Sequence, residues 1–248
     1  MATDAIPKLL EQSQWVIEGT IQKVGASTMP EVPASANTFV VKVDGIIHGP
    51  PEFSDHRGRQ ITLYSENPRG LVVKRSAVFF TRSWLYGKSL AVIEVGRVPK
   101  GTGETVARNV KAAEQALADR RLAERIAKAS LVVAGEVSDT KQGPELRQPI
   151  ETEHHPEWAT AVFKVGDVLK GQPRGSTVDV VYPRSMDELW IESPKLEPGT
   201  TGILILQRNQ KEKGWPVMRV PGLTALDPLD HQPMEELDRV RRLAEGAR

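Results

Sequence analysis

The sequence predicts a mainly β protein with flanking helices, in which two tandem five-stranded barrels are joined by a long helix. Three observations predict this fold. The segment TAVFKVGDVLKG at 160–171 repeats TFVVKVDGIIHG at 38–49, with five of twelve positions identical. The same series of short strand-like segments surrounds each copy in the same order. One long helical segment separates the two series.

The first half begins with a short predicted helix at 3–13, which Thr3 or Asp4 can cap and which tolerates Pro7 in its first turns. Strands follow where apolar and polar residues alternate. The segment at 77–81 is apolar throughout and is predicted to be buried on both faces. The predicted strands are 15–21, 38–43, 60–64, 77–81 and 90–95.

The second half repeats this order at offsets of roughly 120 residues, which indicates an internal duplication and not a solenoid of short repeats. Gly135 takes the place of Gly19 in the middle of a strand, where a barrel strand bends or bulges. The predicted strands are 131–137, the strand from Thr160, 177–182, 202–207 and 217–220.

Between the halves, residues 103–129 form the clearest predicted helix. Val106, Val110, Ala113 and Leu117 make one apolar stripe, and the pair 122 and 126 makes a second, rotated stripe. We expect the first stripe to pack on the first unit and the second on the second unit, with 120–121 facing solvent. The predicted domains are 1–118 and 119–248, and a final helix is expected at about 233–245.

Composition narrows the function. The 248 residues carry a formal charge of +1, which gives nucleic acid or an anionic membrane little to attract. There is no cysteine, so disulfides, thiolate metal sites and cysteine nucleophiles are excluded. No secretory signal and no apolar run of membrane-spanning length is visible. A cytoplasmic location is therefore expected.

The order of LVVAGEV at 131–137, FKVGDVLKG at 163–171, VDVVY at 178–182 and GILIL at 202–206 resembles the netrin-like, or tissue-inhibitor-of-metalloproteinase-like, OB domain. A strand ending V-x-x-V-L-K-G recurs in that family. It stands here at 165–171 and in a weaker form at 43–49. The resemblance implies two tandem OB-like barrels. The zinc-chelating N-terminal cysteine of the family's inhibitors has no counterpart here.

Two groups of residues are candidates for metal binding or catalysis. Glu151, Glu153, His154, His155 and Glu157 could hold a divalent metal, although a solvated loop explains their spacing better.

His231 with Asp227 and Asp230 suggests a catalytic group, but the surrounding prolines favour a turn in which Asp230 is a cap. No nucleophile elbow or phosphate-binding loop occurs. We therefore expect no enzyme activity, no bound metal and no cofactor.

Aromatic and basic residues supply the binding candidates. Arg82, Trp84 and Tyr86 are expected on a loop after the 77–81 strand. The corresponding loop of the second half carries Arg208 and Trp215, and Trp190 lies in a separate segment. Lys42 and Lys164 are the outward polar position that both copies share. The candidates are Arg82, Trp84, Tyr86, Trp190, Arg208, Trp215, Lys42 and Lys164.

Three functions fit these features. The expected one is a non-catalytic binding or assembly module that contacts a protein partner. The alternatives are single-stranded nucleic-acid binding by the barrels and a metal-dependent enzyme that uses the 151–157 cluster. Salt-dependent affinity would indicate the first alternative, and metal analysis would decide the second.

Overall fold

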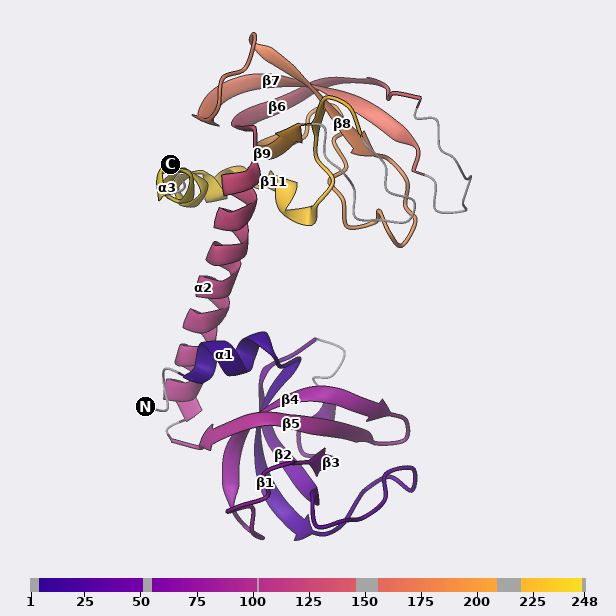
Figure 1. Cartoon of the computed structure of the whole chain (residues 1–248), viewed down its shortest axis with the longest axis vertical. Helices are drawn as coiled ribbons and strands as arrows, with labels where there is room; N and C mark the ends of the chain where they lie inside the picture. Colours follow the sequence, from indigo (N-terminus) through magenta and orange to yellow (C-terminus); the bar gives the residue numbers. More distant parts are fainter. Residues whose placement is uncertain (1–4, 51–54, 102, 146–155, 209–219, 247–248) are drawn as a thin grey trace. The chain divides into compact units, whose positions relative to one another are not determined.

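The computed structural model describes residues 5–50, 55–101, 103–145, 156–208 and 220–246. The chain divides into two compact units, residues 1–118 and 119–248. Each unit is built on a barrel, and helix α2 (Gly103–Lys128) joins the two units (Figure 1). The predicted fold class, mainly β with two barrels joined by a long helix, is confirmed.

The first barrel is closed by five strands in the order β1-β2-β3-β5-β4, and β4 pairs back to β1. Neighbouring strands are antiparallel except for β3 and β5, which are parallel. The strands are β1 (Trp15–Val24), β2 (Thr38–His48), β3 (Gln60–Tyr64), β4 (Ser76–Tyr86) and β5 (Leu90–Pro99).

The interior of this barrel follows the two-residue period of its strands. On β2, Phe39, Val41 and Val43 are buried in the barrel core, and Lys42 between them is exposed. The predicted inward face of β1 is also correct, because Trp15 and Ile17 lie in the same core. Five short strands are thus enough to enclose one continuous apolar interior.

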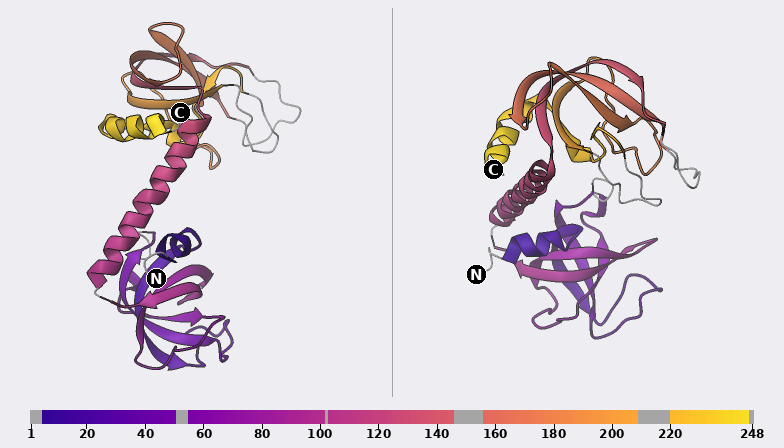
Figure 2. Two further views of the ribbon diagram at one scale, coloured as in Figure 1. Left: turned by 60° about the vertical axis from the view of Figure 1, so that its left-hand side comes forward. Right: turned by 45° about the horizontal axis from the view of Figure 1, so that its top comes forward.

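A second apolar cluster covers the outside of the first barrel. Helix α1 (Ile6–Glu11) and the first half of α2 pack there on Val78 and Phe80 of β4 (Figure 2). The predicted helix cap is wrong, because the N-cap residue is Ala5 and no side chain caps it. Thr3 and Asp4 lie outside the described residues.

The second unit repeats the arrangement with β6 (Leu131–Gln142), β7 (Trp158–Lys170), β8 (Thr177–Pro183), β9 (Thr201–Arg208), β10 (Leu223–Thr224) and β11 (His231–Gln232). The sheet order is β10-β8-β7-β6-β9-β11, and β10 also pairs with β9, which completes a ring of five strands. As in the first barrel, one pair in this ring, β8 and β10, is parallel.

The last strand of the second barrel differs from the prediction. It was expected at 217–220, but residues 217–219 lie outside the described residues and Val220 is not in a strand. The two-residue strand β10 takes the place instead: Leu223 pairs with Val180 as Val92 pairs with Leu63. A strand this short leaves almost no alternating pattern in the sequence to detect.

The duplication extends to the irregularities of the sheets. The β1–β2 pairing has three register shifts, and the β6–β7 pairing has three shifts that each lie 116 residues later. They follow Val16, Glu18, Ile21, Val132, Ala134 and Val137. Such bulges bend a strand so that a small barrel can close.

Glycine is required at the middle shift of each copy. A Cβ on Gly19 would lie 2.5 Å from Val41 Cγ1, and one on Gly135 would overlap the carbonyl oxygen of Lys164. At Gly135 the backbone of the neighbouring strand therefore leaves no space for a side chain, whereas at Gly19 the closest atom belongs to the Val41 side chain. The predicted bend at both glycines is confirmed.

Helix α2 has the two apolar stripes that the sequence predicts. Val106, Val110 and Ala113 pack in the outer cluster of the first unit. Leu122 and Ile126 pack in the second unit, beside β6, β9 and α3 (Leu237–Gly246). The 3-10 turns η3 (Pro228–Asp230) and η4 (Met234–Glu236) precede α3. No helix of the described residues is long and apolar enough to cross a membrane.

Candidate functional site

The outer end of β4 carries three consecutive exposed apolar side chains. Trp84 is 43% exposed, Leu85 37% and Tyr86 67%. We call residues 82–88, this end of β4 with its turn, the hairpin end (Figure 1). The prediction placed Arg82, Trp84 and Tyr86 on a loop, but β4 continues to Tyr86 and pairs there with Leu90. The three side chains are therefore mounted on a strand.

Several contacts hold the hairpin end in place. The ring of Trp84 meets Tyr64 edge-on at 5.4 Å between centroids, and Tyr86 lies 6.4 Å from the buried ring of His56. The indole N–H of Trp15 donates to Ser83 Oγ at 3.3 Å. These contacts restrict the exposed rings, so binding at this surface would cost less conformational entropy than binding to freely moving side chains.

Hydroxyl groups fix the turn after β4. Thr28, from the segment between β1 and β2, has its Oγ1 2.9 Å from Ser89 Oγ and 2.9 Å from Thr62 Oγ1. Thr62 is fully buried on β3. The segment between β1 and β2 and the turn between β4 and β5 are therefore tied together beside the hairpin end.

The charge around the hairpin end is basic. Residues 67–93 contain five Lys and Arg residues and no Asp or Glu, although three of the five precede β4 at its opposite end. Arg82 and Lys88 lie on the hairpin end and are exposed. Arg82 also lines a hollow with Glu66 and Glu94, and Glu94 is bound by Arg97 at 2.6 Å. Lys88 has no ion pair among the described residues.

The binding candidates of the second unit are not gathered in this way. Trp190 is buried and packs edge-on against Trp158 at 5.7 Å, so its ring belongs to the core and not to the contact surface that we expected. Arg208 is exposed at the end of β9, opposite Leu223. Trp215 lies outside the described residues.

The segment around Trp190 contains a feature that sequence reasoning missed. Met186 is 68% exposed, Leu189 59% and Ile191 52%. We call residues 185–194 the acidic turn, because they contain three carboxylates and no basic residue. The sequence signal for this turn is the mixture of apolar and acidic residues around one tryptophan, whereas the prediction rests on the tryptophan alone.

The shared lysines are both exposed, as predicted. Lys42 pairs across the sheet with Thr20 and Gln60. Lys164 borders a hollow of about 390 Å³ together with Glu136, Thr201 and Met234. Because their surroundings differ, the two lysines do not form one repeated site.

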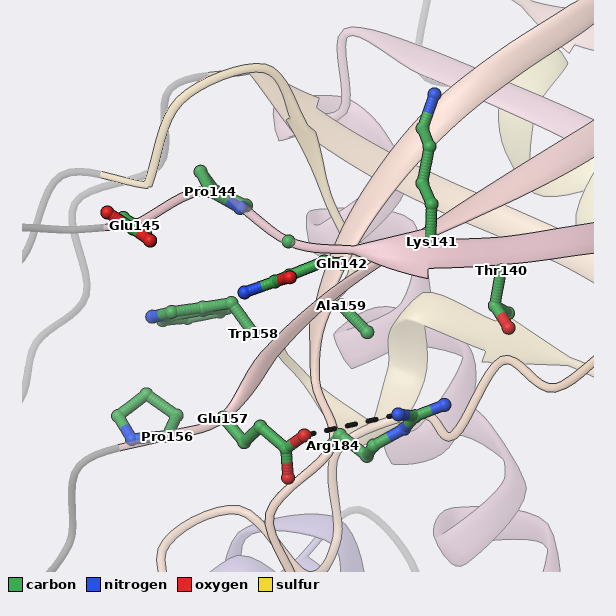
Figure 3. Close-up of a pocket in the computed structure, with 11 residues that line it drawn as sticks. Thr140, Lys141, Gln142, Pro144, Glu145, Pro156, Glu157, Trp158, Ala159 and Arg184 are labelled. Atoms are coloured by element: carbon green, nitrogen blue, oxygen red, sulfur yellow. Dashed lines mark ion pairs between the residues drawn. The ribbon is translucent and has the colours of Figure 1, made fainter.

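A larger hollow of about 760 Å³ lies at the start of β7 (Figure 3). The side chains of Gln142 and Trp158 run alongside each other there, and Arg184 faces Glu157 at 4.0 Å. The buried indole nitrogen of Trp158 has no hydrogen-bond partner within the described ranges. The hollow mixes both signs of charge and has no converging set of donors, so it does not define a ligand.

The Tyr182 hydroxyl is buried nearby and finds no well-formed hydrogen bond among the described residues. Burial raises the pKa of Tyr182, and the Glu197 carboxylate raises it further, while the Arg184 guanidinium opposes the rise. This tyrosine stays neutral to a higher pH than an exposed one. It therefore acts as a core residue with a buried polar tip.

The predicted metal cluster is not assembled by the described residues. Residues 151–155 lie outside them, and Glu157 pairs with Arg184. A search of the described residues finds no group of three His, Asp or Glu side chains that could hold a metal. A metal site at 151–157, the alternative to the solvated loop that we expected, is not tested by the described residues.

The residues around His231 have structural partners. Asp227, and not Asp230, is the N-cap of η3 and accepts from the backbone N–H of Leu229. Asp230 is fully buried and accepts two hydrogen bonds from Arg125, at 2.6 and 2.7 Å. Burial raises the pKa of Asp230, and Arg125 opposes that rise. His231 contacts the carbonyl oxygen of Thr201.

Comparison with known proteins does not identify a family or a function for this chain. No protein-family model matches the sequence, and no curated protein matches it. One similar solved structure is described as "Structural mimicry for functional antagonism". It covers 86% of this chain and 89% of its own, at 8% identity and a TM-score of 0.23, a similarity too low to support an argument.

Proposed function

We propose that the protein is a non-catalytic binding or assembly module that acts through protein–protein contacts of two tandem OB-like barrels. The order β1-β2-β3-β5-β4 with its parallel β3–β5 pair supports the OB assignment and the resemblance to the netrin-like kind. OB-folds bind oligonucleotides and oligosaccharides with the face of strands 2 and 3 and with the loops between strands 1 and 2 and between strands 4 and 5, so the hairpin end lies where this architecture commonly carries a ligand. A cytoplasmic location remains part of this proposal.

The exposure of Trp84, Leu85 and Tyr86 on a paired strand is the observation that carries the proposal. Tryptophan, tyrosine and arginine are the residues that most often dominate binding energy at protein interfaces. Arg82 stands next to this group. Large apolar side chains that are exposed on a strand, and that neighbouring side chains already hold in place, fit a protein contact surface.

Single-stranded nucleic acid is the second candidate, and the same surface favours it. Aromatic rings next to basic side chains can stack bases and neutralise phosphates. Two of the five basic residues of 67–93, Arg82 and Lys88, lie on the hairpin end and provide positive charge there, which the total of +1 conceals. Binding of this kind would weaken steeply as salt is raised.

Site-specific photo-crosslinking in the native host separates these candidates. A benzophenone amino acid at position 86 should form an adduct with a protein, and the substitution Trp84→Ala should reduce the yield. The same amino acid at position 72, where Val72 is 58% exposed at the other end of β4, is the matched control.

Equal adducts at both positions would contradict the assignment of the surface. Anisotropy of a labelled oligothymidylate of about 16 nucleotides tests the second candidate. Saturable binding that falls with salt and is lost in Trp84→Ala would replace the protein partner by nucleic acid.

A further inference from the structure

The acidic turn of the second unit is a rigid element. Trp190, its centre, is held in the core by Trp158, and the hydroxyl of Ser193 donates to the carbonyl oxygen of Leu226 at 2.7 Å. The ammonium group of Lys195 donates to the carbonyl oxygens of Pro183 and Trp190 at 3.0 and 2.7 Å. The packing of Trp190 and these hydrogen bonds restrict the backbone of the turn. Its exposed apolar side chains are therefore presented from an ordered backbone.

The turn exposes apolar and acidic groups together. Met186, Leu189 and Ile191 are each more than half exposed. The carboxylates of Glu188 and Glu192 are exposed beside them. An apolar patch with a charged rim is the usual composition of a protein contact surface, and the rim selects the sign of the partner's charge.

The hairpin end of the first unit has the complementary composition. Its apolar side chains are Trp84, Leu85 and Tyr86, and its rim carries Arg82 and Lys88. Both surfaces therefore expose three large apolar side chains, and their rims have opposite charge. The same chain therefore carries two surfaces, the hairpin end and the acidic turn, whose charges are complementary.

We propose that the acidic turn of one copy of this protein binds the hairpin end of a second copy. This proposal rests on the proposed function and names its partner. The contact is heterologous, because it joins two different surfaces, so each added copy leaves one hairpin end and one acidic turn open. The chain therefore assembles head to tail into short oligomers or a closed ring, and added salt weakens the assembly.

Two one-sided variants of the full chain test this arrangement by sedimentation velocity. Tyr86→Asp disables the hairpin end, because it places an acidic group where an acidic partner must bind. Leu189→Asp removes an apolar contact from the acidic turn. Val72→Asp is the matched control, since Val72 is similarly exposed but lies near the opposite end of β4.

Wild type and Val72→Asp should sediment faster as concentration rises, and less so at high salt. Each one-sided variant alone should stay monomeric. An equimolar mixture of the two should form a 1:1 heterodimer and grow no further, because one intact surface of each kind remains. Thermal unfolding of each variant at the wild-type midpoint shows that the fold is retained.

Three results would overturn the proposal: a wild-type chain that stays monomeric at every concentration, association that persists in both one-sided variants, or a mixture that remains monomeric. A contact between the two surfaces within one chain would give the first result. Failure here leaves the proposed function standing if crosslinking at position 86 captures a different protein. Failure of both experiments removes the protein-binding role of the hairpin end.

Discussion

The guanidinium of Arg125 donates two hydrogen bonds to the carboxylate of Asp230, one at 2.6 and one at 2.7 Å. Asp230 also accepts the backbone N–H groups of Leu226 and Asp227. The pair is largely buried and joins the end of α2 to the turn before α3 within the second unit. The Asp230 carboxylate therefore links helix α2 to the turn that precedes α3.

Removal of that carboxylate should be costly. Asp230→Ala removes both short hydrogen bonds of the buried Arg125 guanidinium and leaves it with the longer 4.0 Å ion pair to Asp227, and we expect a loss of about 3–5 kcal/mol in the free energy of unfolding. Asp179→Ala, which breaks the exposed Lys141–Asp179 pair, should cost less than about 1 kcal/mol. Urea unfolding followed by circular dichroism measures both. Equal losses would mean that Asp230 has no special role.

The two barrel glycines should not tolerate alanine equally. In Gly135→Ala the new methyl group meets the backbone carbonyl of Lys164, which cannot move without bending β7. In Gly19→Ala it meets mainly the side chain of Val41, which can shift. Overpacking costs about 1–3 kcal/mol, and we expect Gly135→Ala at the upper end and Gly19→Ala at the lower. The reverse order in thermal unfolding would refute this interpretation.

The two tryptophans should separate stability from binding. Trp190→Ala empties a buried site and should cost about 3–5 kcal/mol of unfolding free energy. Trp84→Ala should cost about 1 kcal/mol or less, because the ring is partly in solvent already. Chemical denaturation gives both values. A large loss in Trp84→Ala would show that the hairpin end is part of the core.

Stability at alkaline pH should depend on Tyr182. Its pKa is raised in the folded protein by burial, so the unfolded chain loses this proton first as pH rises above about 10. In that range the folded state binds more protons, and its stability therefore falls with rising pH. Tyr182→Phe should remove this part of the loss.

The matched control for Tyr182 is Tyr64→Phe, which leaves the buried hydroxyl in place and should keep the wild-type alkaline loss. Thermal unfolding midpoints from pH 8 to 11 compare the three proteins. Near neutral pH Tyr182→Phe should be about as stable as wild type, because the lost hydroxyl has no well-formed hydrogen bond among the described residues. Identical alkaline profiles for all three proteins would contradict the assignment.

Much of the fold could be predicted because its signals are local. Alternation and short apolar runs located all five strands of the first barrel and four of the second, and the stripes of α2 identified which residues pack on which unit. The strand at Leu223–Thr224 could not be found, because two residues carry no period and their pairing with β8 and β9 depends on distant segments. The outward position of Lys42 and Lys164 was predicted correctly, because it follows from the two-residue period of their strands.

The candidate site was less predictable. Trp84 and Trp190 are equally apolar in sequence, yet one is exposed and the other is buried. The difference arises because Trp158, Val220 and Leu226 converge on Trp190 from elsewhere in the chain. Exposure is a property of what packs on a residue and not of the residue itself.

The sequence alone determined the duplication, the strand faces and the irregularity of the strands at positions 19 and 135, since each depends on the chain's local period or on its comparison with its own second copy. Only the tertiary structure decided the order in which the strands close, the continuation of β4 to Tyr86 and the position of the exposed apolar groups. Those features depend on contacts between residues far apart in sequence, and a local pattern does not specify which distant segments meet.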